Sequence, residues 1–208
     1  MRRSRTSFAL VLLGCGAAPR PATVARCGDA EDALIASQAD VARLSRCTSL
    51  HTLTIRSGGS LDLAKLPLVQ LTGDLKIGPT VGLEDVALSL REVRGAIHVV
   101  GNGLMQGLFL RKLERAGAIT VDGNAALTTI GLPALATAGA LRVTDNASLE
   151  LLDLAALTRL DGELIVTGAP RLNLLDAPVL HAAARVELDA PSVPAETAAA
   201  LRELSREQ

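Results

Sequence analysis

Three consecutive segments of the chain have the same length and share one pattern, and each begins with glycine. They read GAIHVVGNGLMQGLFLRKLERA (residues 95–116), GAITVDGNAALTTIGLPALATA (117–138) and GALRVTDNASLELLDLAALTRL (139–160). A period of this size is the signature of a repeat protein, in which one unit is too small to bury its apolar side alone. The repeat therefore decides the fold class.

The same unit extends in both directions. Gly73 begins a unit 22 residues upstream of Gly95, and Gly162 begins another after one inserted residue. An earlier unit starts at His51 without the glycine, and a degenerate unit starts at Ala184. The chain thus contains six full units and a partial last one.

Apolar residues recur at fixed positions, counted from the first residue of each unit as zero. Positions 2 and 4 alternate as in a strand with one buried face; they hold Leu53/Ile55, Leu75/Ile77, Ile97/Val99, Ile119/Val121, Leu141/Val143 and Leu164/Val166. Positions 10, 13 and 15 are also apolar, beginning with Leu61, Ala64 and Leu66 in the first unit. The recurring glycine and the GN or DN turns leave room for a second short strand, not for a long helix.

Strands and turns that repeat in register form a coil, and stacked coils bury the apolar side that one coil leaves open. The sequence therefore predicts a mainly β fold, a parallel solenoid of about six 22-residue coils over residues 51–190. The alternative is a leucine-rich-repeat horseshoe with helices on its outer side.

Position 7 holds asparagine in three successive units, at Asn102, Asn124 and Asn146. Each follows a residue suited to a tight turn, namely Gly101, Gly123 or Asp145. Because asparagine tolerates left-handed turns and bonds to backbone groups, the three amides are expected to stack as a structural ladder. A row of ligand-binding amides is the alternative.

The two ends of a solenoid need covers. Residues 27–50 are expected to form a helical N-terminal cap, closed by a disulfide between Cys27 and Cys47; the alternative is two free buried thiols. One or two short amphipathic helices are predicted there from Ala33, Leu34, Val41 and Leu44. Residues 191–208 are expected to form a C-terminal capping helix that begins near Pro194 and packs through Thr197, Leu201 and Leu204.

The first residues have the order of a secretory signal, a basic MRRSRTS followed by an apolar FALVLLG. The sequence LLGCG around Cys15 resembles a bacterial lipobox, which implies a signal peptide over residues 1–14, a lipid on Cys15 and a tether over 15–26. Since residue 16 is glycine and not aspartate, an outer-membrane or cell-surface location is expected. An ordinary signal peptide with an unrelated cysteine is the alternative.

RCTSLHTLTI, followed by glycine-led G-x-L-x-V coils with L-x-x-L-x-L halves, resembles the receptor L domain. The likeness covers residues 27–190. It implies a right-handed β-helix, the fold of the ligand-binding lobes of insulin- and EGF-type receptors. That family's animal receptors carry aromatic residues on their binding faces, whereas aromatic residues make up 1% of this chain. No ligand-binding residue is therefore carried over from the family.

Composition argues against several classes of function. The formal net charge of −1 gives no case for nucleic-acid binding. The three histidines fall at different repeat positions, and no metal-ligand spacing, phosphate loop or nucleophile motif appears, so no enzyme, metal or cofactor is expected. A polysaccharide-active β-helix enzyme is a remote alternative. The one aromatic feature outside the signal segment is Phe109, with Arg111 and Lys112 beside it, which we interpret as a contact patch for a protein. A single ring that fills a gap is the alternative.

The sequence therefore predicts a non-catalytic envelope lipoprotein that contacts the membrane through Cys15 and displays a scaffold for protein–protein interaction or surface structure. A receptor-type module that captures a soluble ligand is the alternative.

Replacing Cys15 by alanine removes the sulfur that would carry the lipid. We expect the Cys15→Ala chain to leave the membrane pellet and appear in the soluble fraction, because one cysteine supplies all the acyl chains of the anchor. Fractionation of bacterial cells measures this. A variant that sediments like the unaltered chain rules out the lipid anchor.

Overall fold

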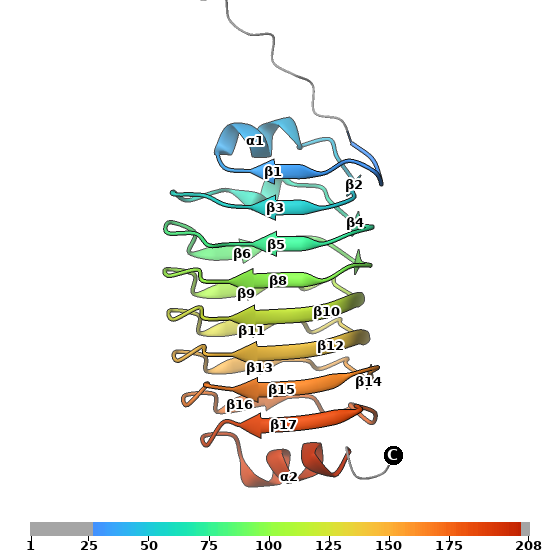
Figure 1. Cartoon of the computed structure of the whole chain (residues 1–208), viewed down its shortest axis with the longest axis vertical. Coiled ribbons are helices and arrows are strands. Elements are labelled where there is room, and N and C mark those ends of the chain that lie inside the picture. Colours follow the sequence, from blue (N-terminus) through green and yellow to red (C-terminus); the bar gives the residue numbers. More distant parts are fainter. Residues whose placement is uncertain (1–26, 205–208) are drawn as a thin grey trace, which may run out of the picture.

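The computed structural model describes residues 27–204, so the signal segment, Cys15 and the tether lie outside the described residues. The chain forms a parallel β-solenoid. Eight strands stack along its front, so seven turns separate the first from the last (Figure 1). Front strands run to the left and back strands to the right while the chain descends, which is the right-handed winding that the resemblance implied (Figure 1).

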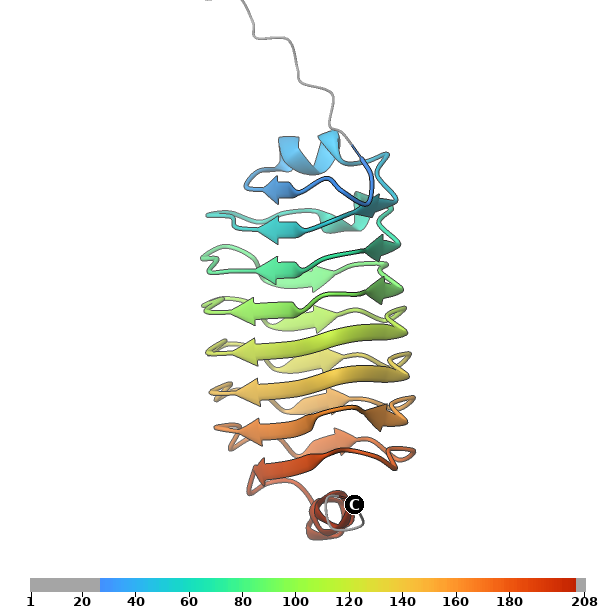
Figure 2. The same ribbon diagram turned by 45° about the vertical axis from the view of Figure 1, so that its right-hand side comes forward.

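Each full turn has three sides. The front sheet contains β1 (Ala33–Ile35), β3 (Leu53–Ile55), β5 (Leu75–Ile77), β8 (Ile97–Val100), β10 (Arg115–Asp122), β12 (Thr137–Thr144), β15 (Glu163–Thr167) and β17 (Arg185–Asp189). The same 12-stranded sheet bends around the side of the stack, turned forward in Figure 2 and called the side sheet below. This part contains β2 (Ser49–Leu50), β4 (Gln70–Leu71), β7 (Glu92–Val93), β14 (Arg159–Leu160) and the first residues of β10 and β12. The back sheet contains β6 (Asp85–Ala87), β9 (Gly107–Phe109), β11 (Thr129–Gly131), β13 (Leu151–Asp153) and β16 (Leu174–Asp176).

The interior consists of continuous columns of aliphatic side chains. Val99, Val121 and Val143 are register partners on successive front strands, and none of them is exposed. A second column runs down the back sheet through Val86, Leu108, Ile130, Leu152 and Leu175. The predicted columns are therefore confirmed, and the strands that form them exclude a horseshoe with helices on its outer side.

The recurring glycines stand where the side sheet bends into the front sheet. A Cβ atom on Gly117 would lie 2.4 Å from the carbonyl oxygen of Gly95, and one on Gly95 would lie 2.6 Å from the carbonyl carbon of Gly73. The N–H of Gly117 donates to the same Gly95 oxygen at 3.1 Å. The glycines thus let successive turns approach closely enough to hydrogen-bond at the bend.

Three details differ from the sequence-based expectation. Most turns have a further short stretch of strand on the side, either a separate strand of two residues or the first residues of β10 or β12. It contributes at most one buried residue and therefore leaves no alternation in the sequence. In the first turn a 3-10 helix (Leu63–Lys65) replaces the back strand, so Leu63 is buried and Ala64 is exposed. In the N-terminal cap, Ala33 and Leu34 belong to β1, not to a helix.

Helices cover both ends of the stack. Helix α1 (Gln38–Arg43) buries Val41, and Leu44, which follows the helix, is buried too. Helix α2 (Ala195–Glu203) begins after Pro194 and packs on β17 through Ala198 and Leu201, with Thr197 and Leu204 half-buried. The predicted C-terminal cap is therefore present, with Ala198 as an additional contact.

Alanine at Gly117 should destabilise the fold, because its Cβ would press against the backbone of the turn above. We expect Gly117→Ala to lower the free energy of unfolding by about 1–3 kcal/mol. Gly103→Ala is the matched control, since its Cβ meets nothing within 4 Å, and should change stability by less than about 0.5 kcal/mol. Urea denaturation measures both, and equal midpoints would contradict the close-approach argument.

Candidate interaction surfaces

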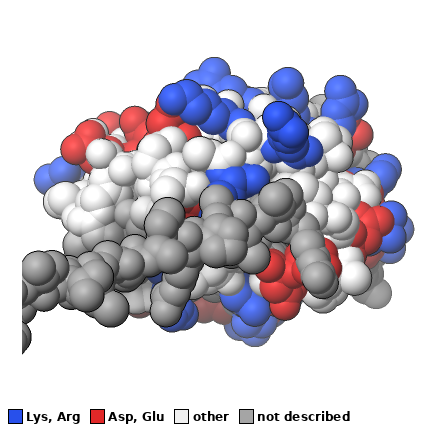
Figure 3. All heavy atoms as spheres, turned by 90° about the horizontal axis from the view of Figure 1, so that it is seen from above, with Lys and Arg blue, Asp and Glu red and all other residues white. Residues whose placement is uncertain are grey.

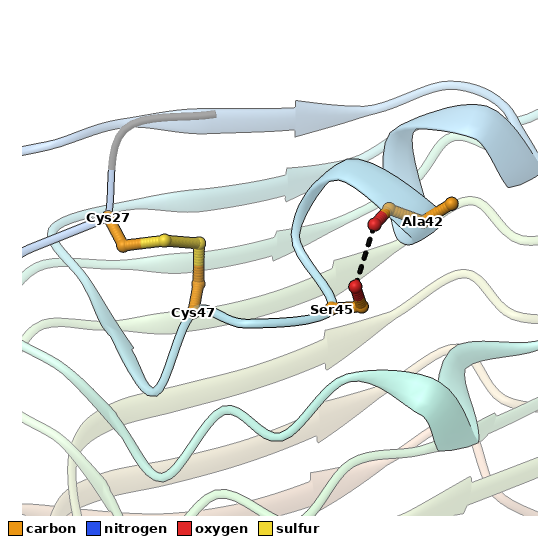
Figure 4. The surroundings of a disulfide bond; sticks show 4 residues. All are labelled: Cys27, Ala42, Ser45 and Cys47. Carbon is orange, nitrogen blue, oxygen red and sulfur yellow. Dashed lines mark hydrogen bonds between the residues drawn. A yellow bond between two sulfur atoms is a disulfide. The ribbon is translucent and has the colours of Figure 1, made fainter. Parts of the chain in front are cut away.

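The predicted disulfide is confirmed. Cys27 and Cys47 are bonded, with their Cα atoms 5.2 Å apart, and Cys47 is fully buried (Figure 4). Ser45 donates to the carbonyl oxygen of Ala42 at 2.8 Å and so ties the end of α1 to the turn that leads to Cys47. The crosslink fixes the start of the described chain to the first turn of the solenoid.

The asparagine ladder lies inside the molecule. Asn102, Asn124 and Asn146 have no exposed surface. The Oδ1 atom of Asn124 accepts the backbone N–H of Asn102 at 3.0 Å and its side-chain amide at 2.8 Å. The Oδ1 atom of Asn146 likewise accepts the backbone N–H of Asn124 at 3.1 Å and its side-chain amide at 3.2 Å. Thr80 extends the ladder by one turn, because its hydroxyl donates to Asn102 at 2.8 Å.

The ladder is a structural device at the corner between the front and back sheets. Gly101, Gly123 and Asp145, which precede the three asparagines, all have positive φ, of 67°, 62° and 54°. This left-handed turn directs the next side chain inward. Because these side chains are buried and hydrogen-bonded to one another and to the backbone, they offer a ligand no accessible surface, which contradicts the alternative of a ligand-binding row.

Phe109 lies half-buried on the outer face of the back sheet. Its ring needs the space that two glycines leave. A Cβ on Gly107 would lie 2.3 Å from Cε2 of the ring, and one on Gly131 would lie 3.3 Å from Cδ1. The guanidinium carbon of Arg111 lies 5.0 Å from the ring centroid, a cation–π contact. The exposed Lys112 follows at the corner between back and side sheets.

A shallow hollow of about 170 Å³ adjoins the ring. Its walls are Phe109, Arg111, Thr129, Gly131, Pro133, Leu151 and Asp153. We call Phe109, Arg111 and this hollow the Phe109 patch. The structure thus brings together the predicted Phe109 and Arg111 with residues of two further turns.

Sequence reasoning missed the ion pairs on the side of the stack, where the chain continues from this patch to β10. Arg94 and Arg115 flank the carboxylate of Glu92, with Nε–Oε1 distances of 3.6 and 3.5 Å. Arg91 pairs with Glu114 at 3.2 Å. We call the five cations of this region the arginine corner: Arg91, Arg94, Arg111, Lys112 and Arg115. Because Glu92 and Arg115 are register partners 23 residues apart, one more than the repeat, the 22-residue alignment does not bring them together.

A second mixed surface lies on the front sheet. Two shallow hollows, of about 300 and 460 Å³, share Arg56 and Lys76 in their walls; His98 lines the first and the exposed Leu34 the second. Asp74 lies beside these cations. The N–H of Ala96, which donates to the carboxylate at 2.9 Å, holds the pKa of Asp74 below its usual value, and Lys76 and His98 add to the lowering.

Alanine at Asn124 would remove the acceptor for two buried N–H groups of Asn102. We expect Asn124→Ala to lower the free energy of unfolding by about 3 kcal/mol, because unsatisfied buried donors are costly. Asn173→Ala, at an exposed position, is the control and should stay within about 0.5 kcal/mol of the unaltered chain. Urea denaturation followed by circular dichroism measures both. Equal stability of the two variants would show that the ladder is dispensable.

No protein family, curated protein or solved structure matches this chain. Within residues 27–204, no helix has the length and apolarity needed to cross a membrane.

Proposed function

We propose that this chain is a non-catalytic lipoprotein of the bacterial envelope that is held on the membrane through Cys15 and binds a protein partner at the Phe109 patch. The observation that carries the binding role is the prearranged ring of Phe109, which rests over glycines, lies under Arg111 and borders a hollow. Aromatic residues and arginine supply much of the binding energy in protein interfaces.

The rigidity of the patch favours binding. The patch lies on β9, β11 and β13, which are interior strands of the back sheet. A partner that docks there orders few side chains, which reduces the entropic cost of association. The interior contributes only aliphatic columns and a buried amide ladder, so recognition is left to outward-facing residues such as Phe109.

A lipid on Cys15 is compatible with this use of the back sheet. Eleven residues separate Cys15 from Cys27, and a chain of this length spans at most about 40 Å. The disulfide joins Cys27 to the first turn, at the end of the stack. The anchor would therefore hold the solenoid by one end and leave the faces of its central turns accessible.

Capture of a soluble ligand is the second candidate. The two front hollows favour it, because Arg56 and Lys76 line both and His98 lines one. Cations at the edge of a hollow suit a small anionic ligand. This role would use the front sheet and leave Phe109 without a function.

A variant of Phe109 separates the two roles. We expect the full chain to recover a protein partner from cell envelopes and Phe109→Ala to recover at least fivefold less, because truncating an interface aromatic typically costs more than 1 kcal/mol. Val179→Ala, which shortens another exposed apolar side chain, is the matched control and should recover as much as the unaltered chain. Circular dichroism verifies that each variant is folded. Equal recovery with all three chains would refute the proposed binding site.

A further inference from the structure

We infer that the partner segment is acidic and carries one aliphatic side chain, with its carboxylates on the arginine corner and its aliphatic side chain in the hollow of the Phe109 patch. This inference rests on the proposed protein-binding role of that patch. It adds the chemistry of the partner, which the patch alone does not define.

The arginine corner has a charge opposite to that of the chain as a whole. The full sequence has 21 Lys and Arg against 22 Asp and Glu, whereas residues 91–115 contain five Lys and Arg against two Asp and Glu. Seen from above, Lys and Arg gather on some parts of the rim of the molecule and Asp and Glu on others (Figure 3), so the surface charge is divided into local regions. The corner is thus a local positive region that attracts acidic groups.

The internal ion pairs leave this charge available. The side chains of Arg91, Arg94 and Arg115 are 61–62% exposed although each pairs with a glutamate. Glu92, which lies between two of them, is only 23% exposed. A guanidinium group has five N–H donors, so one long contact to a shared carboxylate leaves donors for a partner. Glu92 and Glu114 therefore position the arginines without neutralising the corner.

The turn below the corner has the opposite character. Residues 123–141 contain no charged side chain. This stretch supplies Thr129, Gly131 and Pro133 to the hollow, and Leu151 completes its apolar wall. The hollow thus shares Arg111 with the arginine corner and is otherwise uncharged except for Asp153. A segment that combines carboxylates with one aliphatic side chain matches this pairing.

A uniformly anionic surface, such as a membrane, fits less well. Asp153 lines the hollow, and the carboxylate of Asp85 lies next to Gly107, at the edge of the Phe109 ring. These acids repel negative charge on the back-sheet side of the patch while the arginine corner attracts it. The pattern therefore favours a short segment whose carboxylates lie on one side only, which is a property of a peptide and not of a lipid surface.

Fluorescence anisotropy with labelled octapeptides tests this inference on the full chain in detergent. The first probe contains four glutamates and a central leucine, the second has glutamine for each glutamate, and the third has glycine for leucine. We expect the first probe to bind at least tenfold more tightly than the second and severalfold more tightly than the third. Its affinity should fall as salt rises from 50 to 300 mM, because salt screens exposed charges.

Two pairs of substitutions with the same change of charge locate the site. Arg94→Gln with Arg115→Gln should weaken binding of the first probe at least tenfold, whereas Arg56→Gln with Lys76→Gln on the front sheet should change it less than twofold. Equal binding of the glutamate and glutamine probes overturns the inference, as does a larger effect of the front pair. Phosphatidylglycerol added to the detergent micelles, if it displaces the first probe, would assign the arginine corner to lipid instead and also overturn the inference.

The failure of this inference is distinguishable from failure of the proposed function. If Phe109→Ala loses the envelope partner while the Arg94 and Arg115 double variant retains it, the binding site is correct and the acidic partner is wrong. If Phe109→Ala retains the partner, the proposed binding site itself is wrong.

Discussion

Hydrogen bonding between parallel strands of successive turns is the constraint on which this molecule depends. Strands in a sheet lie about 4.8 Å apart. Each turn must therefore return to the same place one strand lower, with each residue directly below the equivalent residue of the turn before. Val121 therefore lies between Val99 and Val143, and the amide of Asn124 lies between those of Asn102 and Asn146. Constant turn length produces both the apolar columns and the polar ladder.

The same stacking of turns determines the surroundings of Phe109. The interior columns of the described turns are filled by aliphatic side chains, and the ring of Phe109 occupies space beside its own strand and the next one. The aromatic side chain of the described part, Phe109, points outward, and its register partner on the next strand is Gly131. The ring is accommodated because Gly107 and Gly131 carry no side chain. Its position on the surface thus depends on two glycines, one on its own strand and one on the next.

Sequence alone predicted the front and back columns, the asparagine ladder and both end covers. It associated the left-handed conformation with the asparagines, whereas the residues before them adopt it. It failed where one turn departs from the repeat. Ala64 occupies a column position but is exposed, because a 3-10 helix replaces the strand there. The side strands were missed because a strand of two residues is too short to show a periodic pattern of apolar residues. Arg115 was not associated with Glu92 because their spacing exceeds the repeat by one residue. The Phe109 patch was half predicted, since Phe109 and Arg111 are neighbours in sequence but Leu151 comes from another turn.

That single-residue shift has a consequence for charge. Between β7 and β10 the side strands are 23 residues apart, although the glycines at the bend, Gly95 and Gly117, keep the 22-residue spacing. Arg94 occupies the position just before the bend in one turn and Arg115 lies on the strand of the next, and both reach the carboxylate of Glu92. With a strict 22-residue repeat, Arg115 would lie opposite Val93 and not opposite Glu92. Irregularity in the repeat, placed where the interior columns are unaffected, thus concentrates charge at one corner, and the surface acquires a distinct site without any change in the core.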